Sequence, residues 1–130
     1  MAYRIKIGKM KKGFTFIELI AVMVIISLLV SIAVPRYHYA IERAKISTLK
    51  QDLFILRKVI DEYYSDKGFY PKSLESLQEE SYIRSIPIDP TTKDRLWEEI
   101  RDDNDINSGI KDVRSRAQGK SYEGISYADY

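Results

Sequence analysis

Gly13, Phe14 and Glu18 have types and a spacing that could carry chemistry. Glycine has no Cβ, so the peptide bond after Gly13 is accessible to a protease that must hold its substrate extended. Glu18 is the only charged residue from Phe14 to Val34, and an unpaired carboxylate in such apolar surroundings would cost several kcal/mol. A cut between Gly13 and Phe14 would create an α-amino group, and the amine of a neighbouring copy could pair with Glu18. If the chain were cut there, Glu18 would have a role in pairing subunits.

The usual constellations of an enzyme are missing from the sequence. It has no cysteine, one histidine, no glycine-rich phosphate loop and no HExxH motif, and its serines have no evident histidine base. His38 stands between Tyr37 and Tyr39, and we expect these three rings to form an aromatic group at a membrane surface. We predict a structural protein that requires no cofactor, and not an enzyme.

The segment that must position Glu18 is FTFIELIAVMVIISLLVSIAV, from Phe14 to Val34. As a helix it would extend about 31 Å, close to the hydrocarbon thickness of a bilayer. Pro35 follows, and it is expected to kink the helix or to end its membrane-spanning part. Small residues would allow close helix packing, and they are Ala21, Ser27, Ser31 and Ala33.

Basic residues before Gly13 set the expected orientation. They are Arg4, Lys6, Lys9, Lys11 and Lys12, five of the 21 basic residues, and the remaining 16 stand against 19 acidic residues. Positive charge ahead of an apolar helix favours a cytoplasmic N-terminus and an exported remainder. No basic stripe for phosphate binding is left after Gly13, so nucleic acid is not an expected partner.

Two other interpretations of this segment stay open. A secretory signal would be cut at small residues after the apolar core, near Ser31, Ala33 and Val34. An ordinary single-pass anchor would not be cut at all. Neither of them accounts for Glu18.

The segment from Arg36 to Lys67 has no proline or glycine and is expected to be helical, with Gly68 as its stop. Apolar residues recur in it every three or four positions and form one stripe, which comprises Ile46, Leu49, Leu53, Leu56, Ile60 and Tyr63. The stripe predicts packing on a small globular body.

Proline and turn residues break the chain after Gly68 into short elements. Ser73 is expected to cap a helix from Leu74 to Glu80, and Ile86 to Thr92 should form an extended loop. Candidate strands are 96–101, 110–115 and 122–127, with turns at Gly109 and Gly119. The predicted fold is α+β: one long N-terminal helix, membrane-spanning in its first half and amphipathic in its second, packed on a small C-terminal antiparallel sheet.

The stretch Lys11-Lys12-Gly13-Phe14-Thr15-Phe16-Ile17-Glu18 resembles the processing motif of type IV pilins and pseudopilins. The resemblance implies that a prepilin peptidase and N-methyltransferase cuts after Gly13 and methylates Phe14, that Glu18 serves assembly, and that Pro35 kinks the helix. A second stretch, Asp-Lys-Gly-Phe-Tyr-Pro at 66–71, followed by Leu74, Leu77 and Asp89-Pro90, is similar to the G-type major pseudopilins of type II secretion systems.

This resemblance implies four regions: a cleaved basic leader (1–13), a transmembrane and filament-core helix (14–35), an amphipathic helix (36–68) and a small globular region (69–130). It implies a single-pass protein of the bacterial inner membrane with a periplasmic C-terminal region. The subunit would lie in membrane lipid before it joins copies of itself, minor pseudopilins and an inner-membrane platform in a periplasmic filament for protein export. The alternatives are a type IV pilus subunit (adhesion, motility, DNA uptake or electron transfer) and an uncleaved membrane-anchored binding domain.

Oxygen-bearing side chains at Asp103, Asp105 and Asn107 alternate as in a calcium loop. However, Ser108 stands where an EF-hand has glycine, and Arg114 stands where it has a bidentate glutamate. G-type pseudopilins bind calcium in their C-terminal region, but an ordinary solvated acidic loop is favoured here over a calcium site.

Overall fold

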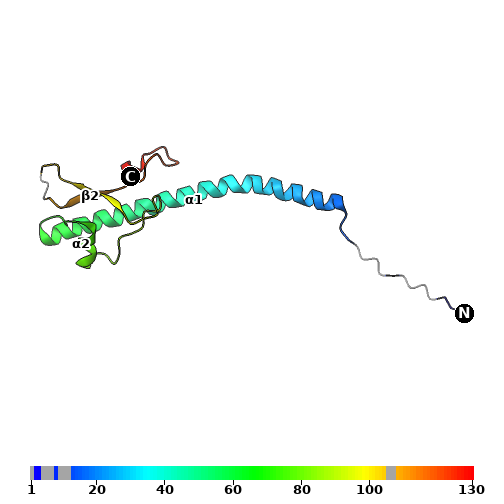
Figure 1. Ribbon diagram of the computed structural model, residues 1–130, viewed down its shortest axis with the longest axis horizontal. Coiled ribbons are helices and arrows are strands. Elements are labelled where there is room, and N and C mark those ends of the chain that lie inside the picture. Colours follow the sequence, from blue (N-terminus) through cyan, green and yellow to red (C-terminus); the bar gives the residue numbers. More distant parts are fainter. Residues whose placement is uncertain (1, 4–7, 9–12, 105–107) are drawn as a thin grey trace. The chain divides into compact units, whose positions relative to one another are not determined.

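The computed structural model describes residues 2–3, 8, 13–104 and 108–130 (Figure 1). Its elements are helix α1 (Phe16–Lys67), helix α2 (Leu74–Glu79), strand β1 (Trp97–Arg101), strand β2 (Ile110–Ser115) and a 3-10 helix, η1 (Tyr127–Asp129). The chain divides into two compact units, Met1–His38 and Tyr39–Tyr130, and α1 contributes to both. The α+β fold predicted from the sequence is confirmed.

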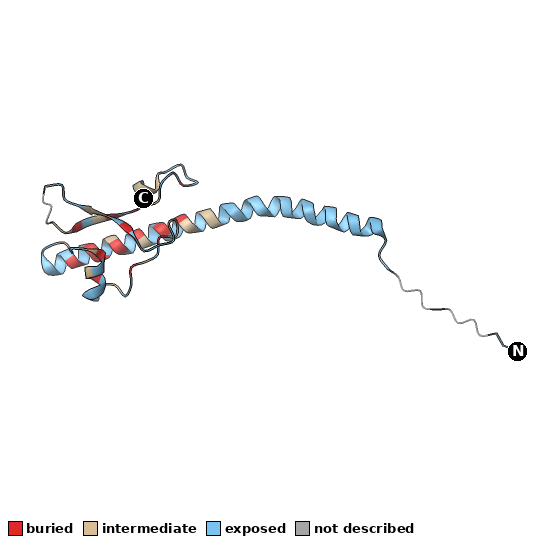
Figure 2. Cartoon of the chain, viewed as in Figure 1, coloured by how far each residue is buried: buried red, intermediate tan, exposed pale blue. Residues whose placement is uncertain are grey.

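In the first unit, α1 carries an apolar surface that no other described residue covers. Every residue from Phe16 to His38 is exposed, and Figure 2 shows this part of the helix in pale blue throughout. Pro35 lies inside α1, so the helix does not end there. A kink at Pro35 stays a prediction.

In the second unit, the predicted stripe on α1 forms the core. Its six residues are 0–4% exposed, and Val59 joins them at 7%. The helix ends at Lys67, where Gly68 takes a φ of 78° that glycine adopts without strain. The apolar periodicity of 3.6 residues therefore predicted the packing face of α1 correctly.

Helix α2 begins where the sequence indicated. The Ser73 hydroxyl accepts a hydrogen bond from the Ser76 N–H at 3.2 Å, which caps the helix as predicted. Leu74 and Leu77 are buried against α1. The helix ends at Glu79, one residue earlier than expected.

Strands β1 and β2 form an antiparallel pair in which Trp97 lies opposite Ser115 and Ile100 lies opposite Asp112. The next pair, Arg101 with Ile110, leaves Lys111 as an extra residue, so β2 carries a bulge. The bulge explains the poor alternation of apolar residues in β2, since Ile110 and Val113 are both buried although they are three positions apart.

The predicted third strand, 122–127, is wrong. Lys120 and Ser126 form an isolated bridge, and the chain between them turns tightly, with the Gly124 N–H bonded to the Ser121 carbonyl at 3.0 Å. The Ser121 hydroxyl also accepts the Glu123 N–H at 3.2 Å, so this serine competes with strand pairing. In the part of the chain that the structure describes, the sheet has two strands.

Candidate processing and assembly site

Gly13 and Phe14 lie just before α1, outside the helix. Phe14 is 93% exposed, and the first helical hydrogen bond runs from the Leu19 N–H to the Thr15 carbonyl at 3.2 Å. The peptide bond between Gly13 and Phe14 is therefore not tied into helical hydrogen bonding. A peptidase could bind this backbone without first unwinding a helix.

The fold itself does not require glycine at position 13. A Cβ added there would have no heavy atom of the described residues within 4 Å, and its φ lies outside the left-handed region. Gly109 is the opposite case, because a Cβ added there would stand 2.3 Å from the Tyr70 carbonyl oxygen. Glycine at position 13 therefore fits a requirement of a molecule that binds this segment, and not a requirement of the fold.

Thr15 and Glu18 form a capping box at the start of α1. The Glu18 N–H donates to the Thr15 hydroxyl, and the Thr15 N–H donates to Glu18 Oε2, both at 3.3 Å. This reciprocal pair satisfies two N–H groups that the first turn of a helix leaves without partners. Sequence reasoning missed the capping box, although its signature, threonine followed three residues later by glutamate, is present. Glu18 therefore has a local role besides any role between subunits.

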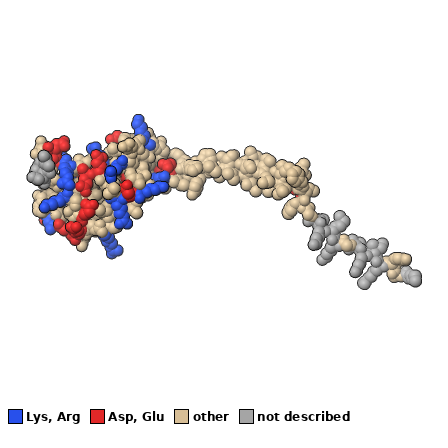
Figure 3. Space-filling model, viewed as in Figure 1, with Lys and Arg blue, Asp and Glu red and all other residues tan. Residues whose placement is uncertain are grey.

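The helix after Glu18 presents exposed apolar side chains, and Figure 3 shows this region almost entirely without charge. The hydroxyls of Ser27 and Ser31 donate to the carbonyls of Met23 and Leu28, both at 2.7 Å. They are satisfied inside the helix and would add little cost in lipid. In the described residues, α1 is the one helix that is long and apolar enough to cross a membrane.

Two of the three rings near the end of the first unit lie edge to face: Tyr37 and His38, with centroids 6.2 Å apart. In the second unit, Tyr39 packs on Tyr122 at 5.4 Å, so the Tyr39 ring also supports the C-terminal segment. The position of these rings at a membrane surface stays a prediction.

Of the three candidate calcium ligands, Asp103 is exposed, while Asp105 and Asn107 lie outside the described residues. Neighbouring Asp102 accepts the Asn104 N–H at 3.3 Å and donates its own N–H to the Ser108 hydroxyl at 3.2 Å. Within the described residues, no group of three or more His, Cys, Asp or Glu side chains could hold a metal.

Asp89 is fully buried, which no pattern in the sequence predicts. Its carboxylate accepts the Thr91 N–H at 2.8 Å and the Ser115 hydroxyl at 2.5 Å, so it joins the loop before β1 to strand β2. Burial of the Asp52 side chain on α1 raises its pKa above the ordinary value, and the charge of Asp89 raises it further. The Asp89-Pro90 pair is therefore a structural feature of the globular unit.

The C-terminal segment is held on α1 by polar contacts. Arg57 binds the Asp112 carboxylate at 2.8 Å and donates to the main-chain oxygen of Tyr130 at 2.7 Å. The Tyr130 hydroxyl donates to Glu123 at 2.8 Å, and Lys50 lies 3.3 Å from the same carboxylate. The hydrogen bond from Tyr130, with further help from Lys50, lowers the pKa of Glu123.

Residues 8–34 match the prokaryotic N-terminal methylation motif. The chain is 33% identical over 100 residues to the type II secretion system core protein G of Escherichia coli strain K12, which covers 65% of this chain and 69% of that protein. It is 26% identical over 98 residues to the core protein G of Pseudomonas aeruginosa, covering 63% and 69%. It is also 26% identical over 114 residues to the type IV major pilin protein PilE of Neisseria gonorrhoeae, covering 85% and 64%. No solved structure gives a significant match.

The matched motif contains Gly13, Phe14 and Glu18, and the matches to core protein G extend well beyond it. They agree with the architecture of one long N-terminal helix and a small antiparallel sheet. The chain therefore belongs to the type IV pilin-like family, and within that family it is similar to the G-type pseudopilins.

Proposed function

We propose that this chain is the structural subunit of a type II secretion pseudopilus. The proposal rests on the structure at the start of α1. The exposed Gly13–Phe14 bond lies outside the helix, and it is followed at once by a capped helix whose apolar surface is exposed. This arrangement suits a protein that is cut, held in lipid and then packed against its own copies.

Processing would remove residues 1–13 with their five basic side chains. The prepilin peptidase hydrolyses the Gly13–Phe14 bond, which leaves a carboxylate on the leader and a new α-amino group on Phe14. The same enzyme methylates that amine. Residues 14–35 then anchor the mature subunit in the inner membrane, with 36–68 and 69–130 in the periplasm.

Assembly would depend on Glu18. Because its carboxylate lies among apolar side chains, transfer into a filament core is costly unless a positive charge meets it. The amine of Phe14 in a neighbouring copy supplies that charge and sets the two helices in register. The apolar surface from Phe16 to Val34 then leaves the lipid and packs against neighbouring helices.

The filament would grow from an inner-membrane platform, with minor pseudopilins as further subunits, and would drive protein export across the outer membrane. The subunit contributes structure and no catalysis. No nucleic acid is expected to bind it, and no cofactor is required.

A type IV pilus subunit is the second candidate, favoured by the alignment with a major pilin that spans 85% of this chain. Deletion of the gene separates the two. Loss of proteins from the culture medium, restored by the intact gene, supports the pseudopilus. Loss of surface filaments with unchanged secretion supports the pilus instead. Genes beside it for a secretin and minor pseudopilins favour secretion, whereas retraction and adhesin genes favour a pilus. If both secretion and filaments persist, an uncleaved membrane-anchored binding domain becomes the better account.

A further inference from the structure

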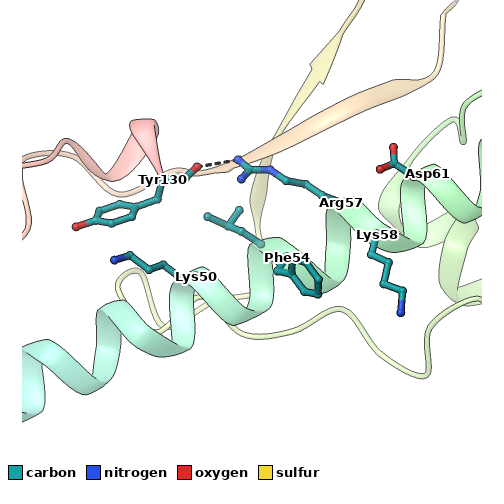
Figure 4. A pocket seen from close by; sticks show the side chains of 7 residues that line it. Lys50, Phe54, Arg57, Lys58, Asp61 and Tyr130 are labelled. Carbon is teal, nitrogen blue, oxygen red and sulfur yellow. Dashed lines mark hydrogen bonds between the residues drawn. The ribbon is translucent and has the colours of Figure 1, made fainter.

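A groove on the second unit lies between α1 and the C-terminal segment, with a volume of about 550 Å³ (Figure 4). Its charged lining comes from α1, and its wall is Tyr130, which Arg57 holds in place. The lining residues are Lys50, Leu53, Phe54, Arg57, Lys58 and Tyr130, together with Asp61. We call this surface the basic groove.

Three residues of the basic groove, Lys50, Phe54 and Lys58, follow each other at four-residue spacing on α1. They form one stripe about 12 Å long, since each residue of a helix rises about 1.5 Å. The Lys side chains are 51% and 64% exposed, and Phe54 is 64% exposed. A large aromatic ring left exposed between two cations, beyond the predicted membrane segment, suits a partner with an apolar side chain between two carboxylates.

Strand β1 and the residue after it carry such a pattern on a different face of the same unit. Glu98 and Ile100 of β1 and Asp102, which follows the strand, stand at alternate positions, a spacing that spans about 13 Å in extended backbone. The extra residue of the bulge belongs to β2. The three residues line one shallow hollow together with Glu99, Arg101, Asp103 and Arg114, and Glu98, Asp102 and Asp103 are exposed. We call Glu98, Ile100 and Asp102 the acidic strip.

We propose that the basic groove of one copy receives the acidic strip of the next copy in the filament, a contact that rests on the proposed function. The groove presents a cation, an aromatic ring and a second cation. The strip presents a carboxylate, an apolar side chain and a second carboxylate, so the two surfaces match in order and in length. Each surface also carries charge of the other sign, since Asp61 belongs to the groove, and Arg101 and Arg114 line the hollow beside the strip. Opposite potentials favour this pairing over two grooves face to face.

The two surfaces lie on different parts of the unit, so the contact is heterologous. A heterologous contact that does not close into a ring generates an open helical array. It would therefore add a specific contact between globular units to the packing of the apolar helices.

Cysteine cross-linking in assembled filaments tests this contact, because the natural chain has no cysteine. Full-length Lys58→Cys is produced together with Asp102→Cys, and in a second experiment with Glu98→Cys, followed by mild oxidation. We expect a disulfide-linked dimer with at least one of the two strip variants. The control pairs Lys58→Cys with Glu79→Cys, an equally exposed acidic position on α2, and should give none.

Filaments that form without either strip dimer overturn the contact but leave the proposed function standing. A Lys58→Cys dimer with itself, in place of the strip dimers, also overturns it. Absence of filaments together with an uncut chain contradicts the proposed function itself.

A charge swap gives an independent test. Lys58→Glu should lower filament yield several-fold. Adding Glu98→Lys or Asp102→Lys singly to the same chain should restore the yield for whichever strip residue faces position 58, because the other carboxylate is kept for Lys50. Circular dichroism of each variant in detergent checks that the fold is retained. If the yield does not fall with Lys58→Glu, or if neither double variant recovers, the proposed contact is wrong.

Discussion

Glu18 and Thr15 bond each other reciprocally across the first turn of α1, with both donor–acceptor distances at 3.3 Å. The carboxylate of Glu18 therefore has a partner within its own chain before any subunit meets it. A capping role needs only a hydrogen-bond acceptor, whereas pairing with an amine needs a negative charge. The two roles can be separated by substitution.

Glu18→Gln should keep the capping box and lose filament assembly, because glutamine also serves in capping boxes but carries no charge. Glu18→Ala should lose both, with about 1 kcal/mol less helix stability at the start of α1. Both variants should still insert in the membrane and be cut. Electron microscopy and membrane fractionation measure the outcome. Normal filaments from Glu18→Gln would show that the charge is dispensable.

Alanine in place of Gly109 and alanine in place of Gly13 should give two different defects, because the surroundings of these glycines differ. Gly109→Ala should destabilise the globular unit by about 1–3 kcal/mol, because its Cβ would collide with the Tyr70 carbonyl oxygen. Gly13→Ala should leave stability unchanged and slow cleavage several-fold. Urea unfolding in detergent and the rate of leader removal measure the two effects. Equal cleavage rates for Gly13→Ala and the natural chain would mean that the peptidase does not require glycine at this position.

Asp52→Asn should stabilise the protein at pH 7. Burial and the charge of Asp89 raise the pKa of Asp52, so the folded protein holds this proton more tightly than the unfolded chain does. The resulting stabilisation is fully present below about pH 4, the ordinary range of an aspartate, and is lost as pH rises through the raised pKa. The advantage of Asp52→Asn should therefore shrink as the pH falls below about 4. A variant that is less stable than the natural chain at pH 7 would show that the Asp52 charge is favourable.

Calcium should not change the stability of the globular unit, because we infer that the loop around Asp103 is a solvated acidic turn. Thermal unfolding of the full chain in detergent, with millimolar calcium and with a chelator, should give the same midpoint. Magnesium serves as the matched divalent control. A midpoint several degrees higher with calcium alone, abolished by Asp103→Asn, would establish a calcium site.

Strong periodicity made the second half of α1 predictable from the sequence, and Ser73 as a cap marked the start of α2. The stripe from Ile46 to Tyr63 repeats over several turns, and each of its members is buried. The third strand failed because Ser121 and Gly124 bond locally and turn the chain where a strand was expected. The bulge at Lys111 hid the pattern of β2, since it shifts which residues face the core. Local side-chain bonding and register thus limited the prediction of the sheet.

The start of the candidate site was also readable from the sequence, because Gly13, Phe14 and Glu18 lie within a few residues of one another. The capping box has a sequence signature too, since threonine at 15 is followed three residues later by glutamate at 18. The burial of Asp89 could not be predicted from the sequence, since its partner Ser115 is 26 positions away in the chain. The close approach of Gly109 to Tyr70 likewise depends on tertiary packing.

Cleavage between Gly13 and Phe14, followed by assembly, can be measured by mass spectrometry of the protein isolated from membranes and filaments. We expect a mature chain that begins at Phe14 with a methylated amine. An intact N-terminus at Met1 in the assembled protein, or a cut after Val34, would contradict it.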